Sequence, residues 1–369
     1  MKREKIAFAL QGGGAHGAYT WGILEKLLEE DLLDIRGFSG TSVGAVTSAL
    51  IVHGLQKNGN RGAIDLLETF WQEVSASSAF ATPAATWFGN NFFYGNLDYT
   101  PWYQSFNYMI NHFSPYQFNP LGINPLKIIL EKMIDFEELQ ESKIKLFVAA
   151  TKVKNGALKV FCLPEINLNA LLASTCLPYL TQSIEVDGEY YWDGGYTGNP
   201  PIYPLIYGTD SKDIMLIQLN PILRTELPES VTEIANRINE ISFNASLESE
   251  MRMLVKGFDI AGKTKDHFFQ LIAVDNPFKV LNYSSKLNTS WEFLSKLRTQ
   301  GREAAELWLK KEFSFVGKSS SPLIKKMFSS MEEGWLHEMI HKPATHLKEF
   351  PIGRSTHAEH KTNTESSIQ

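Results

Sequence analysis

The segment Gly40-Thr41-Ser42-Val43-Gly44 decides the fold of this chain. Gly-x-Ser-x-Gly is the pattern of a nucleophile elbow, a turn between a strand and a helix that is too tight for side chains at its two glycines. Such a turn exposes the serine hydroxyl at the start of a helix. Residues 35–39 can supply the strand, and the small side chains of residues 43–52 favour a helix that packs closely on a sheet. The surrounding sequence therefore favours an elbow at Ser42, although the same string also occurs in ordinary glycine turns.

A glycine loop lies upstream, in Gly12-Gly13-Gly14-Ala15-His16-Gly17. It follows a short apolar run at residues 6–10, which is typical of a buried parallel strand. It precedes residues 18–30, whose apolar side chains recur at helical spacing. Strand, loop, helix, strand, elbow and helix within fifty residues predict an α/β fold with a mainly parallel central sheet.

The two glycine motifs also predict a shared chemistry. When Ser42 attacks a carbonyl group, the carbonyl oxygen becomes negative and needs hydrogen-bond donors. The backbone N–H groups of Gly12, Gly13, Gly14 and Val43 can supply them as an oxyanion hole. Each such donor contributes ~2.7–4 kcal/mol in the transition state, so the loop beside the elbow indicates acyl transfer more strongly than either motif alone.

The remaining elements follow from local patterns. Asn155-Gly156 and Asp187-Gly188 each lie between two short apolar runs and predict β-hairpins. Further strands are expected at 214–219 and 268–274, and helices at 125–133, 168–174, 230–255 and 291–313. Residues 79–126 are rich in aromatic side chains interleaved with Asn, Pro and Gly. We expect this segment to be irregular, either as a subdomain packed on itself or as a cap over a concave apolar site.

Composition excludes several classes of function. With 43% hydrophobic and 21% charged residues, the 369-residue chain has the composition of an ordinary globular protein. A net charge of -6 predicts no nucleic-acid partner and argues against electrostatic attachment to anionic lipid. Two cysteines, Cys162 and Cys176, are too few for a disulfide framework. No stretch has transmembrane length, and the apolar run at 6–10 is too short for a signal peptide, so we expect a cytoplasmic protein. Export without a signal peptide and the oligomeric state stay open.

A serine nucleophile needs a base, and Asp193 is the best candidate. It follows a predicted strand and precedes Gly194-Gly195, which lets the backbone turn sharply at the edge of the sheet. Aspartate is a weak base in water, with a pKa of ~3.9, but desolvation beside Ser42 would raise that pKa. Two alternatives remain: Asp193 only caps a turn, or His267, at the start of a late strand, assists Ser42 in a triad.

Two other motifs suggest competing functions. Residues 12–17 also fit the dinucleotide-binding pattern Gly-x-Gly-x-x-Gly, which requires an acid at the end of the second strand; the nearby acid, Asp34, precedes that strand instead. His337-Glu338-Met339-Ile340-His341 matches a zinc-protease string. Pro343 ends its helix at once, and His346 is one residue short of the third ligand position. We therefore expect no metal and no cofactor.

Taken together, four motifs in order resemble the patatin-like phospholipase family: residues 11–18, 40–44, 173–178 and 193–195. Stretches between residues 240 and 305 look like a bacterial branch of that family, so the resemblance covers roughly residues 5–316. It implies a three-layer α/β fold and a lipid acyl hydrolase, a serine carboxylic-ester hydrolase, without a metal. It also implies that Ser42 is the nucleophile, Asp193 the base and the loop at Gly12, Gly13 and Gly14 the oxyanion hole.

This resemblance sets the remaining expectations. The partner is a lipid or phospholipid, met through transient contact with a membrane or micelle surface. Candidate substrate-binding residues are His16, Trp87, Phe88, Phe92, Phe93 and Trp102. His16 stands where many family members carry arginine or lysine, which leaves the preference for an anionic head group open. The domain prediction is a catalytic domain at 1–316 with the cap at 79–126, a helical extension at 317–350 and a disordered polar tail at 351–369. The alternative function is a non-catalytic lipid-binding or effector-type interaction protein on the same fold.

Overall fold

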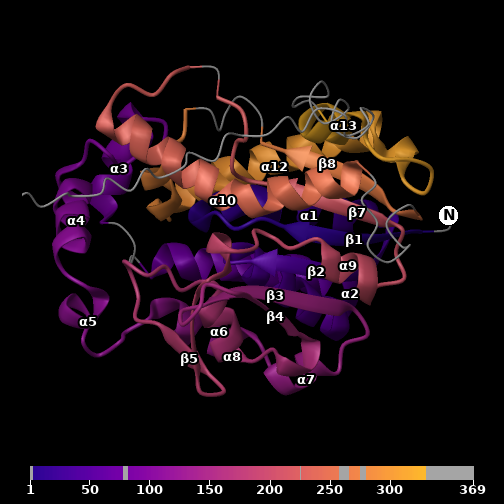
Figure 1. Cartoon of the computed structure of the whole chain (residues 1–369), viewed down its shortest axis with the longest axis horizontal. Coiled ribbons are helices and arrows are strands. Elements are labelled where there is room, and N and C mark those ends of the chain that lie inside the picture. Colours follow the sequence, from indigo (N-terminus) through magenta and orange to yellow (C-terminus); the bar gives the residue numbers. More distant parts are fainter. Residues whose placement is uncertain (1–2, 78–81, 225, 257–265, 275–279, 330–369) are drawn as a thin grey trace, which may run out of the picture. The chain divides into compact units, whose positions relative to one another are not determined.

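The computed structural model describes residues 3–77, 82–224, 226–256, 266–274 and 280–329 (Figure 1). One compact unit spans Met1–Ser329. Residues 330–369, which hold the zinc-protease string and most of the predicted extension and tail, lie outside the described residues. The predicted domain boundary at residue 316 stays a prediction. Packing continues past it, because Ile324 and Phe328 of α13 are buried in the core.

Eight strands of the described chain form one sheet in the order β5-β6-β3-β2-β1-β7-β8, with β4 paired to β3. The strands are β1 Glu4–Leu10, β2 Leu33–Thr41, β3 Lys145–Lys152, β4 Leu158–Cys162, β5 Ile184–Val186, β6 Glu189–Asp193, β7 Asp213–Gln218 and β8 Phe268–Ala273. Strands β3, β2, β1, β7 and β8 run parallel to their neighbours in this order, while β4, β5 and β6 pair antiparallel. The expected mainly parallel sheet and both hairpins are confirmed.

Helices cover both faces of this sheet. They are α1 Gly17–Glu30, α2 Val43–Ala76, α3 Pro83–Phe92, α4 Pro101–His112, α5 Pro115–Phe118, α6 Pro125–Met133, α7 Phe136–Gln140, α8 Leu168–Ser174, α9 Tyr203–Gly208, α10 Val231–Val255, α12 Trp291–Lys311 and α13 Pro322–Ser329. A short 3₁₀ turn, η5, spans Tyr283–Leu287.

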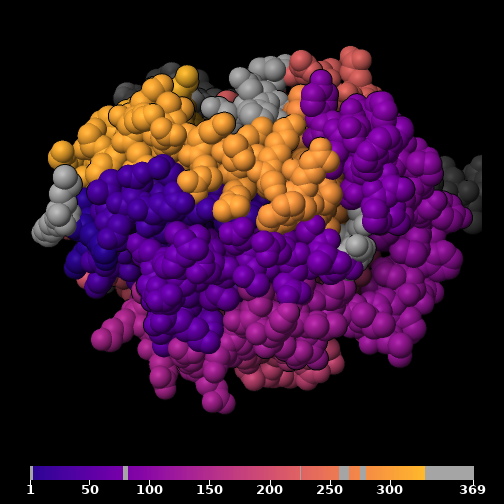
Figure 2. Space-filling model, turned by 180° about the vertical axis from the view of Figure 1, so that it is seen from behind, coloured from indigo at the N-terminus to yellow at the C-terminus, as the bar shows by residue number. Residues whose placement is uncertain are grey.

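Alternation along β1 separates two cores. Phe8 and Leu10 join the core with α1, α2 and α12, whereas Ala7 and Ala9 join the core with α9, α10 and α13. In Figure 2, the indigo α1 lies beside the orange α12 on the face shown, and the two helices pack together. The chain therefore has the three-layer α/β architecture that was expected.

The aromatic segment is helical rather than irregular, which corrects the sequence prediction. Thr82 caps α3 by accepting from the N–H of Ala85 at 3.3 Å, and Thr100 caps α4 by accepting from the N–H of Tyr103 at 3.2 Å. Each threonine is followed by proline at the first helical position, where proline costs no hydrogen bond. These Thr-Pro pairs are helix-start signals that the dense aromatic composition obscured.

Candidate active site

Ser42 occupies a strained turn between β2 and α2. Its backbone has φ 55° and ψ -127°, in a region that residues other than glycine rarely adopt. A Cβ at Gly40 would stand 2.5 Å from the Gly44 carbonyl oxygen, and one at Gly44 would stand 2.2 Å from the Leu10 oxygen. Both glycines are therefore required by close backbone contact. The Ser42 N–H donates to Ser174 Oγ at 2.9 Å, which holds the turn in place.

Strand register brings Asp193 to the same point. Thr41, the last residue of β2, pairs with Ala149 of β3, while Asp193, the last residue of β6, pairs with Ala150. Strand β4 pairs with Ala149 and Ala150 on the other edge of β3. Strands β2 and β6 therefore meet end to end along one edge of β3. As a result, Ser42 and Asp193 line one cavity although 151 positions separate them in the chain.

The Asp193 carboxyl group is fully buried. Its Oδ1 accepts the N–H of Gly195 at 2.7 Å, whereas Oδ2 has no hydrogen bond of normal geometry to a described residue. Burial raises the pKa of Asp193 to about 7, because the charged form is desolvated; the Gly195 N–H, the Ser42 hydroxyl and the charge of Lys286 oppose this rise. A carboxylate with a pKa near neutrality and an open oxygen is suited to accept a proton.

The glycine loop packs directly on the elbow. A Cβ at Gly12 would stand 2.8 Å from Ser42 Cβ, so no larger residue fits there. The Gly12 N–H donates to Asn199 Oδ1 at 2.7 Å, which corrects its expected place among the oxyanion donors. Gly13, Gly14 and Val43 do line the cavity. Val43 is the first residue of α2, so its N–H has no acceptor within that helix.

Four buried amide side chains support this loop; Gln11 and Asn244 lie in stretches that resemble the family, but the sequence assigned none of the four a role. Gln11 donates to Asn244 Oδ1 at 2.8 Å and accepts the N–H groups of Leu219 and Asn220 through its own oxygen. Asn220 donates to the Gly12 carbonyl at 3.0 Å, and Asn199 holds the Gly12 N–H. Isolated Asn and Gln residues carry no local motif, so only the tertiary structure reveals the network.

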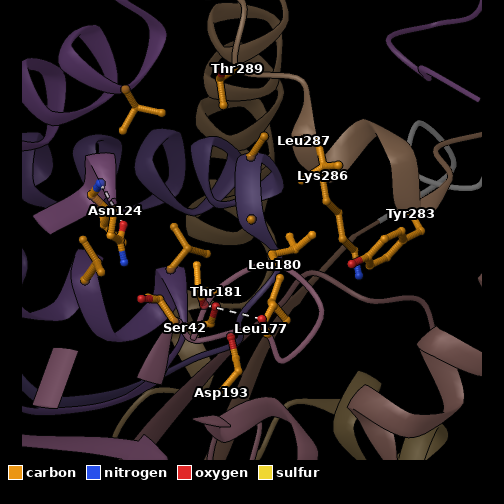
Figure 3. A pocket seen from close by; sticks show the side chains of 18 of the residues that line it. Ser42, Asn124, Leu177, Leu180, Thr181, Asp193, Tyr283, Lys286, Leu287 and Thr289 are labelled. Atoms are coloured by element: carbon orange, nitrogen blue, oxygen red, sulfur yellow. Dashed lines mark hydrogen bonds between the residues drawn. The ribbon is translucent and has the colours of Figure 1, made fainter. Parts of the chain in front are cut away.

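The cavity at Ser42 has a volume of about 180 Å³ and a mainly apolar wall (Figure 3). One side comes from α2, which is interrupted at Asn58 and Gly59 and brings Phe70, Trp71 and Val74 to the cavity that Val46 also lines. The other lining residues are Ala15, Asn124, Leu126, Thr175, Leu177, Leu180, Thr181, Phe243, Tyr283, Lys286, Leu287 and Thr289. Figure 3 shows Ser42 and Asp193 at the same end of this apolar space.

Lys286 is the cation of the cavity wall. Its ammonium group donates to Asn220 Oδ1 at 2.8 Å and Asn239 Oδ1 at 3.0 Å, and lies 5.4 Å from the ring centre of Phe243 and 5.6 Å from that of Tyr283. Figure 3 shows Lys286 and Tyr283 side by side. Burial lowers the pKa of Lys286 to about 8, although Glu240 and Asp193 oppose this effect. Lys286 lies in a stretch that resembles the family, but the sequence assigned it no role.

The structure places the expected substrate-binding residues outside this cavity. His16 is buried and its Nε2 lies 2.8 Å from Ser285 Oγ, beside a second, small cavity. Burial and the charge of Lys286 lower its pKa well below 6.5, so its imidazole is neutral at neutral pH. Trp87, Phe88, Phe92, Phe93 and Trp102 do not line the cavity either. Their contact with an acyl chain stays a prediction.

The residues of the competing interpretations, His267 and Asp34, lie away from the elbow and the glycine loop. His267 precedes β8, whose first residue pairs with the start of β7, whereas Ser42 follows the far end of β2. The length of the strands, roughly 20 Å at six residues, separates His267 from Ser42 and excludes the triad. Asp34 lies near the start of β2 and pairs with Arg36, away from the glycine loop. Among the residues the structure describes, no group of three or more His, Cys, Asp or Glu side chains could hold a metal.

A family model described as patatin-like phospholipase matches residues 8–206. No curated protein matches the sequence. Among solved structures, VipD from Legionella pneumophila has a TM-score of 0.42 and 15% identity, with 84% of this chain and 67% of VipD covered. The type III effector protein ExoU has a TM-score of 0.35 and 16% identity, with 83% and 53% covered. The chain thus spans about two thirds of one protein and half of the other.

Proposed function

The chain belongs to the patatin-like phospholipase family, since the family model matches more than half of its residues, and we propose that it is a lipid acyl hydrolase with a Ser42–Asp193 dyad. The observation that carries the proposal is the meeting of β2 and β6 along one edge of β3. This register accounts for a strained serine and a buried carboxyl group at one end of an apolar cavity.

In the proposed mechanism, Asp193 Oδ2 takes the proton from the Ser42 hydroxyl as Oγ bonds to the ester carbonyl carbon. The carbonyl oxygen of the tetrahedral intermediate accepts hydrogen bonds from the N–H groups of Gly13, Gly14 and Val43. When the ester C–O bond breaks, Asp193 returns the proton to the departing alcohol and an acyl-Ser42 ester remains. Water then loses a proton to Asp193, attacks this ester and releases a fatty acid, after which Ser42 regains its proton.

The apolar cavity wall supports an acyl chain as the group that binds beside Ser42. A lipid or phospholipid ester is therefore the proposed substrate class. Among the described residues, no helix combines the length and apolar character needed to span a bilayer. The proposed substrate is reached from a membrane or micelle surface, through transient contact.

Hydrolysis of a short-chain nitrophenyl ester tests the dyad. Ser42→Ala and Asp193→Asn are each expected to reduce kcat/KM to background, while circular dichroism shows an unchanged fold. Asp187→Asn is the matched control, because Asp187 is exposed in a β-turn at φ 52°, which asparagine tolerates. Full activity of Ser42→Ala or Asp193→Asn contradicts the proposal. Binding of lipid without any turnover by the unaltered protein supports the non-catalytic alternative instead.

A further inference from the structure

Five aromatic rings form a contiguous cluster on the surface of the α3 region: Trp87, Phe88, Phe92, Phe93 and Tyr99. We call it the ring cluster. Its neighbouring ring centres lie 4.8–6.0 Å apart. Trp87 and Tyr99 are each 60% exposed and Phe92 is 59% exposed. Large exposed apolar patches of this kind mark sites of interaction, because leaving them in water costs free energy.

The ring cluster is held firmly near the cavity. The turn after α3 is fixed by Asn96, whose Oδ1 accepts the N–H of Asn282 at 2.7 Å, and by the Leu97 N–H, which donates to Ser284 Oγ at 2.9 Å. Leu97 also packs on Leu287, which lines the cavity. In Figure 1, α3 and α4 lie on the side toward which β1 runs, the same side as the elbow. The exposed rings therefore belong to a fixed surface next to the cavity wall.

The segment that carries the ring cluster is almost uncharged. Between residues 82 and 126 there is no lysine, arginine or glutamate, and the single aspartate is Asp98. Asp98 accepts hydrogen bonds from Ser284 Oγ at 2.6 Å and Asn282 Nδ2 at 3.1 Å, so it is engaged in fixing the turn. The segment offers no cation for anionic lipid, and the whole chain carries a net charge of -6. An uncharged partner surface matches these properties.

We propose that the ring cluster docks the protein on the surface of a zwitterionic bilayer, with Trp87 and Phe92 entering the interface between head groups and acyl chains. This inference rests on the proposed lipid hydrolase function and names the surface that its membrane contact uses. Tryptophan and tyrosine favour that interface because an apolar ring and a polar tip are joined in one side chain. The rings thus contact the bilayer from outside, while the separate cavity at Ser42 receives the acyl chain.

Binding without turnover tests the docking surface. Ser42→Ala protein is sedimented with vesicles of pure phosphatidylcholine, alone and with the added double substitution Trp87→Ser and Phe92→Ser. Each lost ring is expected to weaken the partition coefficient about tenfold, so the double substitution weakens it about a hundredfold. The matched control is Leu307→Ser with Met253→Ser, which removes two exposed apolar side chains from α12 and α10 and is expected to change nothing.

The dependence of binding on salt and on lipid charge provides a second test of the docking surface. Partition is expected to be the same at low and high salt and not to increase when phosphatidylserine is added. Unchanged binding by the double substitution, or binding that requires phosphatidylserine, overturns the proposal. Size-exclusion chromatography in which the double substitution converts a dimer to a monomer also overturns it, because the ring cluster then contacts a second copy.

The two proposals fail separately. In protein with Ser42 intact, Trp87→Ser with Phe92→Ser is expected to hydrolyse phosphatidylcholine vesicles about a hundredfold more slowly, whereas Leu307→Ser with Met253→Ser is expected to hydrolyse them at the normal rate. Absence of ester hydrolysis by the unaltered protein refutes the hydrolase function, yet the sedimentation result still decides whether the ring cluster binds lipid.

Discussion

Replacing Asp193 with asparagine is expected to stabilise the protein while abolishing hydrolysis. The folded-state pKa of Asp193 is raised from 3.8 to about 7. The folded protein therefore holds its proton more tightly than the unfolded chain does, and ionisation of Asp193 costs stability as pH rises between these values. From 1.36 kcal/mol per pKa unit, the cost is about 4 kcal/mol near pH 8, less than about 2 kcal/mol near pH 5 and absent near pH 3.

Asparagine removes this cost because it stays neutral, and its side-chain oxygen can keep the 2.7 Å hydrogen bond from the Gly195 N–H. Urea unfolding of both proteins across this pH range measures the difference in free energy of unfolding. The gain is expected to grow steadily from pH 3 to pH 8, while Asp187→Asn, exposed in its turn, gains nothing comparable. A gain that is the same at every pH, or a loss that deepens toward pH 8, refutes the reasoning.

Three further predictions concern the neighbours of the dyad. Lys286→Met removes a charge that lowers the pKa of Asp193, so the pH midpoint of the rise in kcat/KM should move above 7. Lys286→Arg keeps the charge and should keep that midpoint. An unmoved midpoint in the methionine variant contradicts this coupling. Ser174→Ala leaves the Ser42 N–H without its acceptor and should lower both kcat and the free energy of unfolding, the latter by about 1–3 kcal/mol. A urea unfolding curve equal to that of the parent protein counts against a role for Ser174 in holding the turn at Ser42. Gly12→Ala places a Cβ 2.8 Å from Ser42 Cβ and should reduce ester hydrolysis about a hundredfold. Gly156→Asn is its control, since a Cβ there meets no described atom within 4 Å and asparagine tolerates the positive φ of this turn. Equal activity of these two variants argues against tight packing at Gly12.

Local patterns predicted the fold well because they report local physics. The apolar run at β1, the two turn dipeptides and the helical spacing of α1 each specify an element within a few residues. Ser42 and Asp193 could be paired in advance because each follows a strand and has a glycine within the next two residues that lets the chain turn. The resemblance to a known family added the order of the motifs. The structure brings these two residues together, and their chemical roles stay proposals.

The features that were not predicted depend on tertiary contacts, or lie where two local sequence signals favoured different structures. Lys286 reaches the cavity wall through contacts with Asn220 and Asn239, which are distant in sequence. Gly12 has the same sequence signature as Gly13, yet Asn199 takes its N–H and leaves the cavity to its neighbours. In the aromatic segment, ring density suggested irregular packing, although Thr82 and Thr100 already marked helix starts.

Covalent trapping tests the central claim most directly. A nitrophenyl alkylphosphonate mimics the tetrahedral intermediate and attaches to an activated serine, and peptide mass spectrometry identifies the modified residue. We expect one phosphonyl group on Ser42 in the unaltered protein, and a labelling rate that increases with pH with its midpoint near pH 7. Labelling should be strongly slowed in Asp193→Asn. Labelling of another residue, or labelling of Ser42 that proceeds equally fast without the Asp193 carboxylate, would contradict the account.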